Sequence, residues 1–240
     1  MNCRVMGIVN VTPDSFSDGG RYFRPEEALR RARNLLDEGA AVIDLGGEST
    51  RPGAAPVGWE EEWARIEPVL REMAGWQARV SVDTYHPETA ARALELGAAM
   101  INCVAREPIP AMVALVKAHA AAELVVPCRL GDDDAPYREI AERVYLDPMI
   151  GFGTTREEDL SLVRSVRELA KRGRVLVGVS RKRIVQKLTG EKVLGKNLGG
   201  SVGLALGCAA AGAAMVRVHD VRETVQALRA FGAVFSEEAR

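Results

Sequence analysis

The sequence has 240 residues, of which 47% are hydrophobic, 27% are charged and only 5% are aromatic. This length and apolar content exclude a disordered or fibrous chain and suffice for one large domain or two small ones. The 32 Lys and Arg residues nearly balance the 33 Asp and Glu residues, so no overall charge excess favours a nucleic-acid or membrane surface.

The amino-terminal apolar segment is too short for a secretion signal, because a polar turn begins at Asn10. No later stretch approaches the roughly 20 apolar residues of a membrane span. The cysteines lack metal-binding spacing and stand at Cys3, Cys103, Cys128 and Cys208. We therefore expect a cytoplasmic protein with reduced thiols and neither a nucleic-acid nor a membrane partner.

Eight short segments rich in Val, Ile and Leu are predicted to be strands. They cover residues 5–11, 41–46, 80–83, 99–103, 124–128, 144–147, 175–179 and 215–219. Few charged residues interrupt these segments, as is typical of strands in a buried parallel sheet.

Longer amphipathic segments alternate with these strands and are predicted to be helices. They cover residues 25–38, 60–73, 87–96, 108–119, 135–143, 157–171, 201–211 and 221–231. In the first, one face is shared by Ala28, Leu29, Ala32, Leu35 and Leu36. The fifth segment, residues 135–143, is the weakest of these helix predictions. The alternation predicts an α/β fold with one domain over residues 1–240, a (β/α)8 TIM barrel with a shortened fifth βα unit.

A doubly wound open sheet is the alternative arrangement for such an alternation. It would need a nucleotide-binding fingerprint, and the Gly151-Phe152-Gly153 segment does not continue into the required glycine pattern. No P-loop motif occurs either. The barrel is therefore favoured.

Polar residues gather at the predicted carboxyl ends of the strands, where a TIM barrel builds its active site. Long polar loops follow the first two strands, at residues 10–20 and 46–53. The later strands end in Asp83, Asn102, Asp147, Arg181 with Lys182, and Arg217 with His219. Carboxylates, an amide and cationic groups are thus expected to converge on one mouth.

These residues fall into two chemical sets. Asp83, Asn102 and Asp147 can form hydrogen bonds with a flat heterocycle rich in nitrogen. The second set can surround a phosphate-type anion and comprises Asn10, Arg51, Arg217 and His219. The implied ligand is a heterocycle that carries a phosphate ester.

Five motifs make the sequence similar to the dihydropteroate synthases of the folate pathway, which are pterin-binding enzymes. They are MGIVNVTPDSFSDGG at residues 6–20, DLGGESTRPGA at 44–54, SVDT at 81–84, SRK at 180–182 and RVHDV at 217–221. The first two are long and specific, and the resemblance covers nearly the whole chain in order.

The resemblance implies a TIM barrel that joins 6-hydroxymethyl-7,8-dihydropterin pyrophosphate to 4-aminobenzoate and releases pyrophosphate and 7,8-dihydropteroate. It assigns the pterin to Asp83, Asn102, Asp147 and Lys182, and the diphosphate to Asn10, Arg51, Arg217 and His219. It assigns the aminobenzoate to Thr50, Pro52, Phe152, Arg181 and Lys182. Asn10 is implied to hold Mg²⁺, the catalytic residues are Asp83, Lys182, Arg217 and His219, and a homodimer is expected.

The chain departs from the family pattern between Asn102 and Thr154. Family members usually have Asn-Asp after the fourth strand and Met-His-Met at the end of the fifth, where this chain has Asn102-Cys103 and Val126-Pro127-Cys128. Two alternatives to an active synthase therefore stay open. One is a paralogue that transfers a methyl group from a methyl-pterin, and the other is a pterin binder without turnover.

Overall fold

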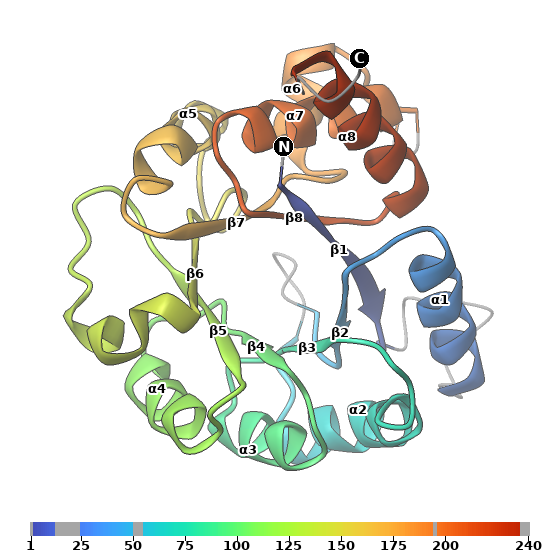
Figure 1. The fold of residues 1–240 in the computed structure, drawn as a ribbon, viewed down its shortest axis with the longest axis vertical. Coiled ribbons are helices and arrows are strands. Elements are labelled where there is room, and N and C mark those ends of the chain that lie inside the picture. The colour runs from blue at the N-terminus through green and yellow to red at the C-terminus, as the bar shows by residue number, and fades with distance from the viewer. Residues whose placement is uncertain (1, 13–24, 50–54, 194–195, 236–240) are drawn as a thin grey trace.

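The eight predicted strands form and close into one parallel barrel in the order β1-β2-β3-β4-β5-β6-β7-β8. The computed structural model describes residues 2–12, 25–49, 55–193 and 196–235. The strands are Arg4–Asn10 (β1), Val42–Gly46 (β2), Val80–Asp83 (β3), Met100–Asn102 (β4), Glu123–Pro127 (β5), Val144–Asp147 (β6), Arg174–Gly178 (β7) and Met215–Val218 (β8). Figure 1 shows them as a ring with the helices outside, which confirms the predicted TIM barrel.

The helices occupy the predicted segments to within about one turn at each end. They are Pro25–Asp37 (α1), Trp59–Met73 (α2), Pro87–Glu95 (α3), Ile109–Ala118 (α4), Arg156–Leu169 (α5), Arg183–Thr189 (α6), Leu198–Ala210 (α7) and Val221–Phe235 (α8). Helix α6 was not predicted, because its few residues continue the basic cluster that follows β7. Within the described part of the chain, no helix is long and apolar enough to cross a membrane.

The barrel contains two apolar layers because alternate strand residues point inward and outward. The inner layer is Met6, Val42, Met100, Val125, Tyr145, Leu176 and Met215. A larger layer between strands and helices includes Leu35, Ile43 and Ile66, each fully buried. Burying these side chains supplies the main stabilisation of the fold.

The fifth βα unit is short, as predicted. In place of an α-helix it has the 3₁₀ segment Ala135–Arg143 (η2), with non-helical dihedral angles at Ile140 (φ −125°, ψ 22°). This segment packs beside α4, and the two leave a groove of about 350 Å³ lined by residues that include Val113, Lys117 and Pro136. The outer layer is therefore thinnest here.

Arg143, the last residue of η2, compensates for part of this shortening. Its Nη1 atom donates hydrogen bonds to the carbonyl oxygens of Val116 at 2.8 Å and His119 at 3.1 Å, and also lies within 3.5 Å of two further carbonyls. Helix ends leave carbonyl groups without partners inside the helix, and a cation is favourable there. Arg143 thus ties the end of α4 to the start of β6.

This arrangement predicts the effect of Arg143→Ala. The substitution should lower the free energy of unfolding by about 2 kcal/mol, because several carbonyl groups lose a charged donor. Urea denaturation measures the change. The matched control is Arg138→Ala, whose exposed side chain pairs only with nearby carboxylates and should cost under about 1 kcal/mol. Equal losses in both variants would contradict the capping role.

Candidate active site

The central feature of the barrel mouth is Arg217, which reaches from β8 to carboxylates on β2 and β3. Its Nε atom lies 2.6 Å from Oδ2 of Asp44 on β2, and its Nη2 atom lies 2.7 Å from Oδ2 of Asp83 on β3. Asp44 is fully buried and Asp83 is 8% exposed. One guanidinium therefore forms ion pairs with two buried carboxylates on the neighbouring strands β2 and β3.

The protonation of this group reflects both burial and pairing. Burial disfavours the charged guanidinium and would lower the pKa of Arg217. The carboxylates of Asp44 and Asp83 outweigh this effect and raise the pKa of Arg217 above its ordinary value. Burial raises the pKa of Asp83 to about 7, while Arg217 opposes the rise and Asp44 adds to it. Burial and Asp44 therefore favour the neutral form of Asp83, and Arg217 favours the anion.

Asn102 joins the same group from β4. Its Nδ2 atom donates to Oδ2 of Asp44 at 3.1 Å, and the register places Asn102 beside Asp83. Three buried oxygen atoms at these strand ends, Oδ1 of Asp44, of Asp83 and of Asn102, have no hydrogen-bond partner among the described residues. Buried acceptors without partners are costly, so they mark a place where a ligand can donate N–H groups.

Asp147, at the end of β6, lies in a tight turn. Its Oδ1 atom accepts a hydrogen bond of 2.7 Å from the backbone N–H of Met149, which has a positive φ of 63°. Such a conformation is strained for a residue with a side chain. Burial raises the pKa of Asp147, and the positive charge of Lys182 opposes the rise.

Lys182 extends back over this turn from the start of α6. Its Nζ atom donates to the carbonyl oxygen of Ile150 and lies 4.7 Å from the centre of the Phe152 ring. Burial lowers the pKa of Lys182 to about 8, and the carboxylate of Asp147 limits the decrease. The structure therefore brings Asp147, Lys182 and Phe152 together on the β6–β7 side of the mouth.

His219 follows β8 and is held by Ser180 from the end of β7. The Ser180 hydroxyl accepts a hydrogen bond from the backbone N–H of His219 and lies 3.2 Å from its Nδ1 atom. The carbonyl oxygen of His219 accepts a 2.6 Å bond from Arg31 of α1. Ser180 and Arg31 thus fix the backbone and the ring of His219.

Arg181 is the predicted residue that turns away from this group. It has a φ of 59°, and its guanidinium forms a two-pronged ion pair with Asp220, including a 3.1 Å contact from Nε to Oδ2. Its backbone N–H donates to Ser201 of α7. The side chain is therefore directed toward the start of α8.

Asn10 ends β1 beside Gly46 of β2. A Cβ atom on Gly46 would lie 3.8 Å from Oδ1 of Asn10 and 3.8 Å from Oδ2 of Asp83, so the two side chains flank this glycine. The predicted residues Thr50, Arg51 and Pro52 lie outside the described part of the chain.

Sequence reasoning missed Asp44, the shared partner of Arg217 and Asn102. It lies inside the apolar strand β2, and a single carboxylate within an apolar strand pattern does not by itself indicate a functional residue. The sequence did contain a signal for Asp44. It stands two residues before Gly46, so both residues lie on the inward face of β2, and Gly46 pairs with Asp83 in the sheet. A carboxylate on the inward face of a barrel strand needs a cation, and Arg217 was the candidate.

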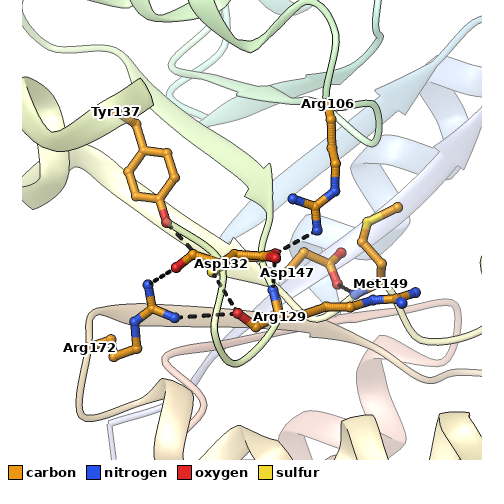
Figure 2. Close-up of polar contacts among 8 residues, drawn as sticks. Arg106, Arg129, Asp132, Tyr137, Asp147, Met149 and Arg172 are labelled. Atoms are coloured by element: carbon orange, nitrogen blue, oxygen red, sulfur yellow. Dashed lines mark hydrogen bonds and ion pairs between the residues drawn. The ribbon is translucent and has the colours of Figure 1, made fainter. Parts of the chain in front are cut away.

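The region between β5 and β6, where the sequence departs from the pterin-binding pattern, is held by Asp132. Its Oδ2 atom accepts hydrogen bonds from Nη2 of Arg106 at 2.6 Å and from the backbone N–H of Arg129 at 2.7 Å. Arg172 donates to the carbonyl oxygen of Asp132 at 2.7 Å, and Figure 2 shows these contacts beside the turn of Asp147. The replaced segment thus has its own polar framework.

Comparisons with known proteins show the family of the chain. Residues 6–141 and 138–219 match the family described as pterin binding enzyme. The chain is 40% identical over 261 residues to the dihydropteroate synthase of Neisseria meningitidis serogroup C, covering 96% of this chain and 92% of the relative.

Two solved structures are similar over almost the whole chain. Dihydropteroate synthase of Xanthomonas albilineans with 4-aminobenzoic acid has a TM-score of 0.85 at 38% identity, covering 98% of this chain and 94% of the other. The enzyme of Anaplasma phagocytophilum with bound 6-hydroxymethylpterin-monophosphate has a TM-score of 0.84 at 31% identity, covering 98% and 100%.

The lowered pKa of Lys182 predicts how Lys182→Met changes stability. At pH 7 the folded protein holds a partly buried charge, so the variant should have a free energy of unfolding higher by about 1 kcal/mol. The pKa is about 8 in the folded protein against an ordinary value of 10.5, so the wild type gains stability between these pH values. The difference from the variant should therefore shrink as pH rises from 8 to 10.5.

Urea denaturation at several pH values checks this result. The matched control is Lys171→Met, because the Lys171 side chain is 66% exposed and its removal should leave the pH dependence unchanged. A Lys182→Met variant that is less stable than the wild type at pH 7, with a difference independent of pH, would refute the prediction.

Proposed function

The chain belongs to the pterin-binding enzyme family, and from this premise we infer that it acts as a dihydropteroate synthase in folate biosynthesis. It is a transferase that condenses 6-hydroxymethyl-7,8-dihydropterin pyrophosphate with 4-aminobenzoate to give 7,8-dihydropteroate and pyrophosphate. The 4-aminobenzoic acid and pterin complexes of the two similar structures support this substrate pair.

The observation that carries the pterin assignment is the set of three buried acceptor oxygens on Asp44, Asp83 and Asn102. A dihydropterin ring presents an exocyclic amino group and ring N–H groups along its edges. These donors match acceptor oxygens that have no partner in the protein. Asp147 and Lys182 would complete the pterin site from the β6–β7 side.

The diphosphate of the substrate would bind at the opposite part of the mouth. Its proposed ligands are Asn10, Arg51, Arg217 and His219. Arg217 is already paired with Asp83, so the same guanidinium would contact the anion and the carboxylate at the pterin. Arg217 would thus couple the pterin site to the diphosphate site, because a change of charge at one site alters the electrostatic interactions of Arg217 at the other.

The aminobenzoate would approach from the side of Phe152 and Lys182. The Lys182 ammonium lies 4.7 Å from the Phe152 ring and supplies a positive charge for the benzoate carboxylate. Thr50, Pro52 and Arg181 are the other proposed contacts. The ion pair between Arg181 and Asp220 would have to open for Arg181 to reach this substrate.

The residues account for the reaction through electrostatics and positioning. As the bond between the pterin methylene carbon and the diphosphate oxygen breaks, positive charge develops on the pterin and negative charge on the leaving group. An ionised Asp83 stabilises the first, and Arg217 with His219 stabilises the second. The arylamine is already neutral at pH 7, so no strong base is needed, and Asp83, Lys182, Arg217 and His219 are the proposed catalytic residues.

Mg²⁺ is the proposed cofactor, with the amide oxygen of Asn10 as its protein ligand. The described residues contain no group of three or more His, Cys, Asp or Glu side chains suited to a metal. The site nevertheless fits, because the amide oxygen of Asn10 flanks Gly46 together with a carboxylate oxygen of Asp83, and Mg²⁺ takes oxygen ligands and keeps several waters and substrate phosphates in its shell. When bound, the ion would neutralise charge on the departing pyrophosphate.

The remaining features of the proposal concern assembly and location. We propose a single-domain homodimer in the cytoplasm without a nucleic-acid or membrane partner. Helix α7 presents exposed glycines at Gly199, Gly203 and Gly207, where an added Cβ atom would meet nothing within 4 Å. This flat face beside the exposed Leu198 supports close packing of a second copy, and the four free cysteines support a reducing compartment.

A methyl-pterin methyltransferase is the second candidate, because the segment after β5 departs from the synthase pattern. Methyl transfer needs no anion site, so the retained Arg217 and His219 weigh against it. A pterin binder without turnover is the third candidate, and it would keep the acceptor oxygens but form no product.

The test is incubation of the purified protein with the pterin pyrophosphate, 4-aminobenzoate and Mg²⁺, with pyrophosphate release and dihydropteroate followed together. Asp83→Asn should lower kcat/KM by about 100-fold or more, because the variant cannot become anionic. The wild-type rate should rise with pH through about 7 as Asp83 ionises, and this limb should be absent in the variant.

Asp37→Asn is the matched control, because it makes the same chemical change on the exposed side of α1 and should retain full activity. Tight pterin binding without condensation would exclude the synthase and favour the binder. Methyl transfer from a methyl-pterin without pyrophosphate chemistry would favour the second candidate.

A further inference from the structure

Three arginines gather at the end of the barrel opposite the proposed active site. Arg4 begins β1, Arg174 begins β7, and Arg79 directly precedes β3. Because all eight strands are parallel, their amino ends meet at one mouth. We name Arg4, Arg79 and Arg174 the amino-terminal arginine cluster. Arg79 and Asp83 lie at opposite ends of one strand, roughly 13 Å apart along it.

The cluster is organised around Glu123 and Tyr145. Glu123 accepts from Nη2 of Arg79 at 2.7 Å and from Nη1 of Arg174 at 2.6 Å. Arg4 and Arg174 both donate to the hydroxyl of Tyr145, and the Arg174 guanidinium carbon lies 4.2 Å from the centre of that ring. Tyr145 is fully buried, so these contacts hold the guanidinium groups in place.

The positive charges of the cluster exceed the negative charge available to it. Among the described residues, Glu123 is the one carboxylate that forms an ion pair with any of the three arginines. Burial lowers the pKa of Arg4, Glu123 opposes this effect, and Arg79 and Arg174 lower the pKa further. Three guanidinium groups and one carboxylate leave a local surplus of two positive charges.

Arg174 also has donors that the protein does not use. Its Nε and Nη2 atoms are buried and have no hydrogen-bond partner among the described residues. These two atoms are not exposed to solvent, whereas the Arg174 side chain as a whole is 34% exposed and that of Arg79 is 46% exposed. An anion would meet the exposed part of the cluster first, and Arg174 would turn its unused donors toward the anion, which accepts several N–H groups at once.

We propose that the amino-terminal arginine cluster binds a phosphate-type dianion, either inorganic phosphate or the phosphate group of a small ester. Two negative charges match the surplus, and planar guanidinium groups bind phosphate oxygens in pairs. Binding would stabilise the amino-terminal end of the barrel, because the anion would connect β1, β3 and β7 and reduce the electrostatic repulsion among the three arginines. This site is separate from the proposed synthase site and does not depend on that function.

An NMR titration of the full chain tests the proposal. Signals of the arginine Nε–H groups are followed while inorganic phosphate, or glycerol phosphate in a second arm, replaces chloride at constant ionic strength. The Arg174 signal should shift to saturation. Saturation with both compounds would assign the site to phosphate esters as well, and saturation with inorganic phosphate alone would assign it to the free ion.

Arg79→Gln should weaken the apparent phosphate affinity at Arg174 by at least about fivefold, because it removes one of the three charges. The matched control is Arg71→Gln, an exposed arginine of α2 that pairs with Glu67 and should leave the affinity within about twofold. Neither residue lies at the catalytic mouth. Thermal unfolding in the absence of phosphate, unchanged from the wild type, establishes that both variants are folded. An Arg174 signal that does not respond to either compound, or equal affinities in the two variants, would overturn the proposal.

Discussion

The ion-paired group of Arg217, Asp44 and Asp83 is the constraint on which the arrangement of the mouth depends. Two carboxylates buried in the barrel would repel each other and lose their hydration without a cation between them. Arg217 supplies that cation from β8 and thereby connects β8 to β2 and β3, which do not pair with it in the sheet. Asn102 extends the group to β4. The acceptor oxygens left over at these strands are then held in fixed positions, which is what recognition of a flat heterocycle requires.

Most of the fold could be predicted from the sequence, because the strands are apolar runs and the helices carry a clear periodicity. The missed helix α6 is too short to show a periodic pattern, and its Arg183 and Lys187 resemble a solvated basic segment. Asp44 was missed because a strand pattern predicts that a residue is buried but does not predict that two buried carboxylates, Asp44 and Asp83, pair with the same arginine. Positions at strand ends were predicted correctly for Asp83, Asn102 and Asp147, whereas Lys182 lies beyond the end of β7, directly before α6. The outward direction of Arg181 depends on its backbone conformation and on Asp220, which no local pattern reveals.

The near-zero net charge of the chain conceals an uneven distribution along the barrel. At the carboxyl ends of the strands, Arg217 and Lys182 are balanced by buried carboxylates, and burial shifts the pKa values of Asp83 and Lys182 while these opposite charges limit the shifts. At the amino ends, Glu123 balances only part of the arginine charge. The segment between β5 and β6 in the shortened fifth unit is held by its own contacts through Asp132 and Arg143. It differs from the family pattern while Arg217 keeps both of its ion pairs.

A double-mutant cycle on the free energy of unfolding tests the role of the Arg217 group most directly. The cycle compares Arg217→Met, Asp44→Asn and the double variant at pH 7. Arg217→Met alone should cost about 3–5 kcal/mol, because it leaves two buried carboxylates without a cation. The double variant should be more stable than the sum of the single effects implies, with a coupling energy of about 2 kcal/mol. Effects that add to within about 0.5 kcal/mol would contradict the claim that this shared cation organises the mouth of the barrel.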